Sequence, residues 1–481
     1  MNVDVFPFHP AAGRVAVSAM RSVLSRVLPG RLLAVAALAA TLALPPAAPA
    51  AAQRSLSVVR DAEIEALVAD YARPILDAAG LGKSGIEIVL VNDPSFNAFV
   101  TGRRIFINTG ALMMAETPNE IIGVLAHEAG HIAGGHQQRL REQLARAQPM
   151  AVTATLLGAG AAAAGAATGT DGLAQGGAGI ATGGMEAARR SVLAYQRTEE
   201  TTADRAAITY LERTGQSARG MLKTFERLAG SMALAGVRVD PYQISHPMPR
   251  ERIANLETLA RGSKNFERAD PPALQQRHNL MRAKIAAYTQ GQAAAARMFA
   301  RDPRSVPALY ADAIGSMLSG NARAAVGKID ALVRAAPKNP YFHEMRGEIL
   351  MKAGRPAEAA DAFATALRLD PHKSGIIQIG YGQALMATDK PDLVRKAVVE
   401  LQSGLSRTKE YAAGYRYLAQ AHGKLGNVAE AELTTAEGHF YSGNYREAKI
   451  FAARAQQKLA RGTPAWLRAQ DIINYRQPGR R

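Results

Sequence analysis

The stretch from Thr117 to His136, TPNEIIGVLAHEAGHIAGGH, constrains this chain more than any other part of its sequence. At its centre His127 and His131 stand four residues apart, and Glu128 follows the first of them. On an α-helix two side chains four positions apart lie on the same face, so both imidazoles can bind one metal ion. The pattern HExxH also places a carboxylate beside such an ion as a general base. We therefore expect a helix that carries a metal site.

The local sequence predicts that helix. Pro118 suits the first helical position, and Thr117 with Glu120 has the spacing of a capping box. A stripe of apolar residues predicts one buried face: Ile121, Ile122, Leu125 and Ala129. The alternative is a core helix that carries two histidines by chance, because short motifs also match by accident.

Length, cysteine content and the N-terminal sequence limit the class of protein to which this chain can belong. A chain of 481 residues predicts two or more domains. It has no cysteine, which leaves His, Glu and Asp as the strong metal ligands. Arginines followed by the apolar run Leu32–Leu44 and by small residues up to Ala52 predict a cleaved signal peptide over residues 1–52. A retained membrane anchor is the alternative, although the run is short for a bilayer span.

The formal net charge of +17 makes the chain basic. For an exported protein, lipid headgroups, lipopolysaccharide and acidic proteins are the anionic partners to expect, and an arginine-rich compositional bias explains the charge equally well. No nucleic-acid-binding motif is recognisable in the sequence, so we expect no nucleic acid as a partner.

A small sheet is expected before the metal helix. IEIVLV at residues 86–91 predicts a strand, and the apolar groups Phe99–Val100 and Ile105–Ile107 on either side of Thr101–Arg104 predict a hairpin. An exposed edge strand within Asn97–Asn108 would bind an extended peptide by adding it to the sheet. The alternative is ordinary core sheet.

The segment 147–185 has an unusual composition, since no charged residue occurs from Ala147 to Thr170. Its length would permit a membrane span, but glycine and alanine make insertion weak. We expect a helical hairpin or a mobile loop that acts as a lid or as a peripheral membrane contact. A buried helix pair joined by a glycine-rich loop over residues 169–184 is the alternative.

A second acidic motif follows in YQRTEETTADRAAITYL. Glu200 and Asp204 are four residues apart, so Glu200 can complete the metal site while Asp204 orients a ligand histidine. Two acidic residues at this spacing, taken alone, usually lie on a solvent-exposed face of a helix. His136 competes as third ligand, but it would reach the same ion only if Gly134 and Gly135 break the helix.

The turn SHPMPRER brings a third candidate, His246. A loop histidine is usually incidental, but beside a metal site it would stabilise the oxyanion or sit on the metal in a resting state. Arg252 is expected to be its structural or electrostatic partner.

Together, HEAGH, ETTAD and HPMPRER resemble the three motifs of the peptidase family that includes the CAAX prenyl protease and the bacterial heat-shock membrane protease. Those relatives span membranes. With its leader and soluble body, this chain more closely resembles the periplasmic members with tetratricopeptide repeats, the β-barrel assembly-enhancing proteases.

The resemblance implies a role for each candidate residue. It implies one zinc ion per chain on His127, His131 and Glu200. It also implies that Glu128 is the base, that Asp204 supports a ligand from behind without binding the metal, and that His246 is a catalytic or regulatory loop residue.

The C-terminal part repeats, because Pro303, Pro337 and Pro371 follow one another at the 34-residue period of tetratricopeptide repeats. We expect about four units between residues 270 and 475, stacked as an α-solenoid that binds proteins. The predicted fold is therefore mainly helical α+β: a zincin-type metallopeptidase domain with a small sheet over residues 53–265, then the repeat domain.

The expected activity is zinc-dependent peptide hydrolysis. By resemblance, the workplace is the periplasm, the substrates are misassembled outer-membrane proteins, and the repeats dock on the barrel assembly machinery. A periplasmic chaperone or assembly factor with a latent protease site is the main alternative. A purely structural zinc site is the other.

Overall fold

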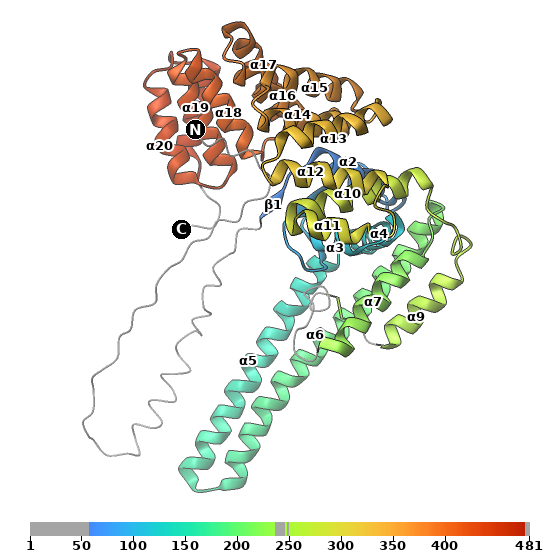
Figure 1. Ribbon diagram of the computed structural model, residues 1–481. Helices are drawn as coiled ribbons and strands as arrows, with labels where there is room; N and C mark the ends of the chain where they lie inside the picture. Colours follow the sequence, from blue (N-terminus) through green and yellow to red (C-terminus); the bar gives the residue numbers. More distant parts are fainter. Residues whose placement is uncertain (1–56, 236–245, 248–249, 477–481) are drawn as a thin grey trace, which may run out of the picture. The chain divides into compact units, whose positions relative to one another are not determined.

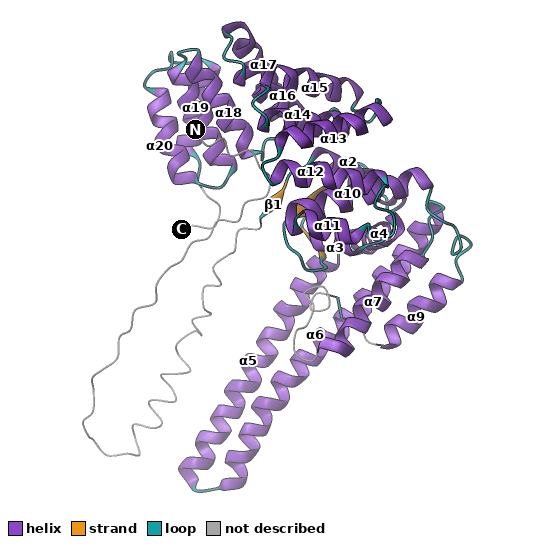
Figure 2. Cartoon of the chain, in the orientation of Figure 1, coloured by secondary structure: helices purple, strands orange, loops and turns teal. Residues whose placement is uncertain are grey.

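The computed structural model describes residues 57–235, 246–247 and 250–476 (Figure 1). The predicted signal peptide and residues 248–249 of the third motif lie outside the described residues. The described chain is mainly helical with one small sheet (Figure 2), which confirms the predicted fold class.

Contacts divide the chain into two units. The first contains Tyr71–Ala269, and the second contains Val59–Asp70 together with the chain from Asp270 onward. Helix α2 (Ala62–Ala78) contributes residues to both units. The first unit contains all six candidate site residues.

The sheet has four strands in the order β1-β2-β4-β3. Their bounds are β1 Val58–Val59, β2 Glu87–Val91, β3 Ala98–Thr101 and β4 Arg104–Asn108. β2 is parallel to β4, and β3 is antiparallel to β4 with Phe99 opposite Phe106. The two strands form the predicted hairpin, whose turn uses the positive φ of 62° at Gly102. β3 is the edge strand, on the side away from β2.

The helices of the first unit follow the sheet: α3 Thr109–Met114, α4 Pro118–Ala133, α5 His136–Thr168, α6 Asp171–Arg213, α7 Arg219–Ala235 and α9 Arg250–Arg261. α4 is the predicted metal helix and is buried from Pro118 to His131. Its N-terminus differs from the expected capping box, because the Thr117 side chain makes no cap hydrogen bond. Glu120 is instead fully buried and paired with Lys223 and Arg227 of α7.

Two glycines of α4 allow other helices to come close. A Cβ at Gly123 would lie 2.9 Å from the backbone of Met221 in α7, and one at Gly130 would lie 3.0 Å from the carbonyl oxygen of Ala203 in α6. Any larger residue would push these helices apart. The approach at Gly130 is what brings the acidic motif of α6 up to the histidines of α4.

The segment 147–185 forms an antiparallel helical hairpin, with its turn at Gly169 and Thr170. The glycine-rich stretch 169–184, which the alternative interpretation took as a loop, is helical from Asp171 onward. The pair is also not buried, since only 11% of the apolar window of α5 is inside the structure. The alternative of a buried helix pair is therefore wrong.

The second unit is built of helices. They are α10 Pro272–Gln290, α11 Gln292–Met298, α12 Val306–Leu318, α13 Ala322–Ala335, α14 Pro340–Lys352, α15 Pro356–Leu369, α16 Gly375–Ala387, α17 Pro391–Arg407, α18 Ala412–Lys424, α19 Val428–Tyr441, α20 Tyr445–Gln456 and α21 Pro464–Asn474. From α12 onward they form five successive helix pairs, one more than the sequence suggested. The pair α16–α17 is longer than its neighbours, because α17 has 17 residues whereas α15 and α19 have 14 each.

Candidate metal centre

Four side chains from three parts of the first unit converge on one point. His127 and His131 come from α4, Glu200 from α6, and His246 from the chain just before α9; one ligand atom of each lies within 4.8 Å of the others. The His127 Nε2 atom is 3.0 Å from His131 Nε2 and 3.3 Å from Glu200 Oε2. The His131 Nε2 atom is 3.4 Å from Glu200 Oε1. Imidazole nitrogens with one carboxylate, all nearly buried, suit a divalent metal such as zinc.

Asp204 lies behind the first histidine. Its Oδ1 atom is 3.0 Å from His127 Nδ1, the ring nitrogen that faces away from the cluster. A carboxylate in this place fixes the ring orientation and leaves Nε2 free to bind a metal. The spacing of Glu200 and Asp204, one helical turn, directs both carboxylates to the same imidazole.

Arg252 of α9 supports both carboxylates. It donates hydrogen bonds of 2.7 and 2.8 Å to Asp204, and its Nη1 atom is 2.8 Å from Glu200 Oε2. Burial alone would raise the pKa of Asp204, but this guanidinium outweighs burial and holds that pKa below its usual value. We expected Arg252 to be the partner of His246. Its side chain instead contacts Asp204 and Glu200. It also donates a hydrogen bond of 2.9 Å to the carbonyl of Pro247, the residue after His246.

His136 occupies the position of an orienting residue rather than a ligand. The helix does break before it, with Gly135 at φ 64°, and His136 begins α5. Its Nδ1 atom lies 2.9 Å from His131 Nδ1, on the side of the ring away from the cluster, while its Nε2 atom is 2.6 Å from Glu199 Oε2. His131 is thus backed by His136 and Glu199 as His127 is backed by Asp204.

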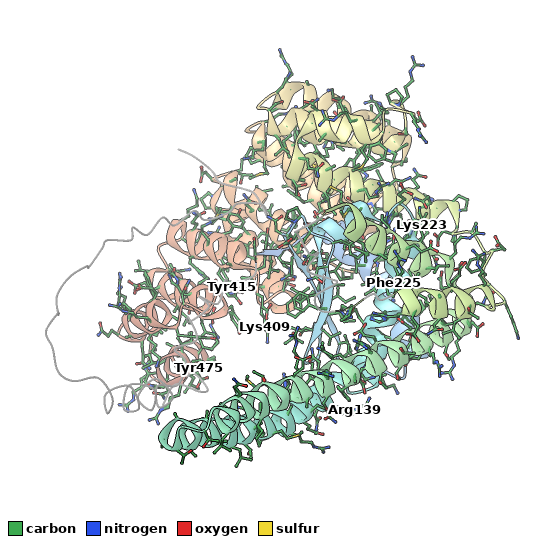
Figure 3. The ribbon with its side chains drawn as sticks, turned by 90° about the horizontal axis from the view of Figure 1, so that it is seen from below. Arg139, Lys223, Phe225, Lys409, Tyr415 and Tyr475 are labelled. Atoms are coloured by element: carbon green, nitrogen blue, oxygen red, sulfur yellow. The ribbon has the colours of Figure 1, made fainter. Side chains whose placement is uncertain are left out.

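Glu199 and Phe225 are functional neighbours that sequence reasoning missed. Glu199 is also 3.1 Å from Arg139 of α5. Phe225 lies on α7 and is labelled in Figure 3. Its ring packs edge-on against His127 at a ring-centroid distance of 5.5 Å, and the Arg252 guanidinium lies 5.3 Å from the same ring. Glu199 and Glu200 are adjacent in the sequence, but only Glu200 stands four residues before Asp204, so only Glu200 was recognisable as part of a motif. Phe225 carried no signal.

Glu128 is placed to act as a base. Its carboxylate is 1% exposed, and neither oxygen has a hydrogen-bond partner among the described residues. The Nε2 atom of His246 lies 3.5 Å from Glu128 Oε1. Burial raises the pKa of Glu128, which improves a carboxylate as a proton acceptor near neutral pH. A buried carboxylate without a hydrogen-bond partner costs stability, and a catalytic role explains why this one is kept.

The charge of the centre favours a cation. Burial would lower the pKa of His127, but Asp204 and Glu200 outweigh burial and raise this pKa to about 9. The histidines in turn hold the pKa of Glu200 well below its usual value, against the effect of burial. Carboxylates that hold a proton on a buried imidazole also stabilise a metal cation bound in its place.

A cleft of about 260 Å³ opens onto the centre. Its lining includes Glu128, His131 and Glu200 on one side and Phe99 and Val100 of the edge strand β3 on another. The Gln137 side chain is also part of it, accepting a hydrogen bond of 3.1 Å from the Gly102 N–H and donating one to the Val100 carbonyl. The edge of the sheet is therefore beside the metal ligands.

The geometry defines a class of protein: a metallopeptidase centre on a helix beside an edge strand, followed by helical repeats. Comparison with known proteins gives the family. Residues 59–260 match Peptidase family M48, and residues 319–374 match the tetratricopeptide repeat. This chain therefore carries a peptidase M48 domain with tetratricopeptide repeats, and it is a metalloprotease.

Curated relatives match most of the chain. The beta-barrel assembly-enhancing protease of Escherichia coli (strain K12) is 22% identical over 423 residues, which cover 85% of this chain and 82% of the relative. A Vibrio cholerae protein provisionally given the same name is 25% identical over 85% of this chain and 83% of its own. The crystal structure of MamA aligns with 34% of this chain and 90% of its own at 18% identity, with a TM-score of 0.27 that is too low to bear on the fold.

Proposed function

We propose that this chain is a zinc-dependent endopeptidase of the periplasm that hydrolyses peptide bonds of misassembled outer-membrane proteins. One observation carries the proposal: His127, His131 and Glu200 meet at a point beside Glu128, whose buried carboxylate has no hydrogen-bond partner among the described residues. The names of the relatives support a role in the assembly of β-barrel proteins. The predicted signal peptide supports export to the periplasm.

The two histidines and Glu200 would hold the zinc ion. When bound, zinc supplies Lewis acidity toward a carbonyl and makes water easier to deprotonate. Glu128 takes the proton of the attacking water and passes it to the leaving amine. Asp204 and His136 keep the two imidazoles in place. Arg252 keeps the buried Asp204 carboxylate ionised and holds Glu200 through its Nη1 atom. The β3 edge aligns the substrate backbone.

His246 gives a specific reason to consider the second candidate function. Its Nδ1 atom lies 3.2 Å from both oxygens of Glu200 and 3.3 Å from His127 Nε2, inside the ligand cluster. A fourth protein ligand is typical of closed zinc sites, whereas catalytic sites leave that position open. The chain in this state would be a latent protease that acts as a periplasmic chaperone or assembly factor. We assign His246 the role of a cap that must leave before substrate enters.

Replacing His246 tests the peptidase function and the cap together. His246→Ala should cleave an unfolded outer-membrane barrel protein roughly tenfold faster than wild type, because an open state that is a minor population becomes the main one. Zinc content, measured by plasma mass spectrometry, should not change. His343→Ala, a histidine of the repeat unit, should cleave like wild type.

The possible results separate the candidates. Loss of cleavage at unchanged zinc would instead assign His246 to oxyanion stabilisation. Absence of cleavage by both proteins, with binding of the unfolded substrate retained, would favour the assembly factor.

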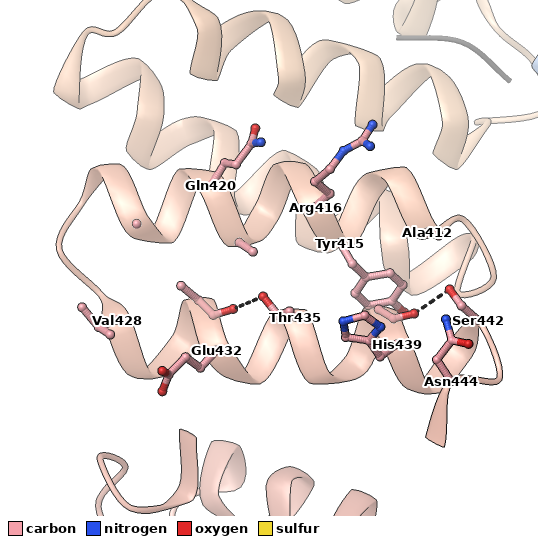
Figure 4. A pocket seen from close by; sticks show the side chains of 14 residues that line it. Ala412, Tyr415, Arg416, Gln420, Val428, Glu432, Thr435, His439, Ser442 and Asn444 are labelled. Carbon is pink, nitrogen blue, oxygen red and sulfur yellow. Dashed lines mark hydrogen bonds between the residues drawn. The ribbon is translucent and has the colours of Figure 1, made fainter. Parts of the chain in front are cut away.

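The repeats offer a place for a partner. A pocket of about 690 Å³ lies between α18 and α19, and its lining includes Tyr415, Arg416, Glu432 and His439 (Figure 4). Val428 stands at its rim with 53% of its surface exposed. We propose that the barrel assembly machinery docks on these repeats, since tetratricopeptide solenoids bind proteins on such surfaces.

Val428→Asp should weaken binding to the purified barrel assembly machinery by roughly tenfold, because it places a charge in an apolar contact. Asp is well tolerated at the first position of a helix, so the fold should be unaffected. Val399→Asp, on α17 outside the pocket and 62% exposed, is the control. Equal binding by both variants, measured by surface plasmon resonance, would exclude this pocket as the docking site.

A further inference from the structure

The hairpin of α5 and α6 has a part that the peptidase site does not use. The two helices run antiparallel and side by side (Figure 1). Their ends nearest the metal centre carry His136, Glu199 and Glu200. Beyond Arg146 the hairpin has no charged residue until the turn, and Asp171 is the only one from there to Glu186.

The contact between the two helices is made by small residues. A Cβ added at Gly158 would lie 2.7 Å from that of Ala181, and one added at Gly184 would lie 2.0 Å from that of Ala154. The interface therefore has no room for larger side chains. Gly158 and Gly165 are the residues of α5 that are buried beyond the metal centre. Little apolar surface is removed from water by this packing.

The large apolar side chains point outward instead. Leu156 and Leu157 are 65% and 63% exposed, and the same holds to a lesser degree for Met150, Val152, Leu173, Ile180 and Met185. A helix pair in water normally buries such residues and exposes its small and polar ones. Small residues between the helices and large apolar ones outside are the arrangement of helix pairs in lipid.

Length and charge agree with that environment. From Ala147 to Thr168, α5 extends roughly 33 Å at 1.5 Å per residue, close to the ~30 Å of a bilayer hydrocarbon core. Its mean hydropathy over an 18-residue window is 1.5, and it is the one helix of the described residues that is long and apolar enough to cross a membrane.

Basic residues stand where the apolar part begins. The register that pairs Ala154 with Gly184 puts Arg146 near the level of Arg189 and Arg190, and all three are exposed. Glu186 forms ion pairs with both arginines of α6, which leaves this level with a net positive charge. Arginines at the end of an apolar segment bind anionic lipid headgroups.

The geometry points to a lipid bilayer with anionic headgroups as the partner of this hairpin, whose end from Met150 to the turn at Gly169 inserts into the membrane. The inference does not depend on peptidase activity. Among the roles that the sequence left open for residues 147–185, the structure favours the membrane contact. Insertion of the hairpin would hold the metal centre near the membrane surface.

Single cysteines test the insertion, since the natural chain has none. Leu157→Cys and the control Val399→Cys, both highly exposed, are labelled in the full chain with an environment-sensitive fluorophore. Vesicles of phosphatidylethanolamine and phosphatidylglycerol should shift the emission of the first label to the blue. Spin-labelled lipid should quench it. The label at position 399 should respond to neither, and unchanged emission at position 157 would overturn the proposal.

A second pair of variants tests binding without a label. Leu156→Arg combined with Leu157→Arg should lower the fraction that floats with these vesicles by about tenfold or more, whereas Val399→Arg should float like wild type. Circular dichroism should show equal helix content, because these side chains are exposed. If wild type does not float but forms a dimer in light scattering that the double variant loses, the surface joins two copies of the chain and the membrane proposal is wrong.

Discussion

Glu128→Gln should reduce cleavage of an unfolded outer-membrane barrel protein by roughly 10²–10⁴-fold, the range by which a positioned general base accelerates proton transfer. Glutamine has nearly the same shape but accepts no proton, so the fold and the zinc content should not change. No buried hydrogen bond is lost, because neither Glu128 oxygen has a hydrogen-bond partner among the described residues. Cleavage rates are measured by gel densitometry, and zinc by plasma mass spectrometry.

Glu142→Gln on the exposed face of α5 is the matched control and should keep the wild-type rate. The same two variants separate protease from assembly factor in cells that lack the natural gene. If Glu128→Gln restores barrel assembly in full and no substrate accumulates, hydrolysis is not the function. A variant that binds substrate, does not cleave it and fails to restore assembly agrees with the proposed activity.

Arg252→Ala should have the largest effect on stability and on metal binding. It removes the guanidinium that pairs with the buried carboxylates of Asp204 and Glu200, and breaking a buried ion pair typically costs about 3–5 kcal/mol of unfolding free energy. Since Asp204 then no longer holds His127 firmly, zinc affinity should fall by roughly 10–100-fold. Urea unfolding followed by circular dichroism and zinc competition with a chelating dye measure the two effects.

Arg250→Ala is the control, because Arg250 lies on the same helix and is exposed. The single tryptophan, Trp466, belongs to the repeat unit and provides an independent signal. Its unfolding transition should be the same in both variants. Wild-type zinc affinity in Arg252→Ala would show that the guanidinium does not support the ligand set.

The parts of the centre that the sequence could predict follow from helix periodicity. His127 and His131, and likewise Glu200 and Asp204, share a face because each pair is one turn apart, and this relation does not depend on the rest of the fold. The packing of α6 against α4, which brings the two pairs together, was harder to predict from the sequence. It depends on Gly130, whose missing side chain lets α6 approach, and a helical glycine has no recognisable signal in one sequence.

Contacts between distant segments could not be predicted from local pattern. Arg252 was expected beside His246, its neighbour in sequence, but electrostatics places it on Asp204 and Glu200, where two buried carboxylates require a cation. The buried pairing of Glu120 with α7 replaced a local capping box for the same reason.

The hairpin shows how composition misleads. Glycine lowers helix propensity, so residues 169–184 suggested a loop. In the structure they are helical, and Gly177 and Gly184 lie where α6 touches α5. Tertiary contact between small residues outweighs their poor intrinsic preference, and a single sequence does not reveal which helix lies opposite.

The most direct test of a zinc centre that hydrolyses peptides is cleavage of an unfolded barrel protein after the metal is removed and returned. The account predicts that chelation lowers the rate by at least ~10²-fold and that about one equivalent of zinc per chain restores it, because the proposed reaction needs a Lewis acid, which His127, His131 and Glu200 would hold. Undiminished cleavage by the metal-free chain, or zinc binding at this centre without recovery of cleavage, would contradict it.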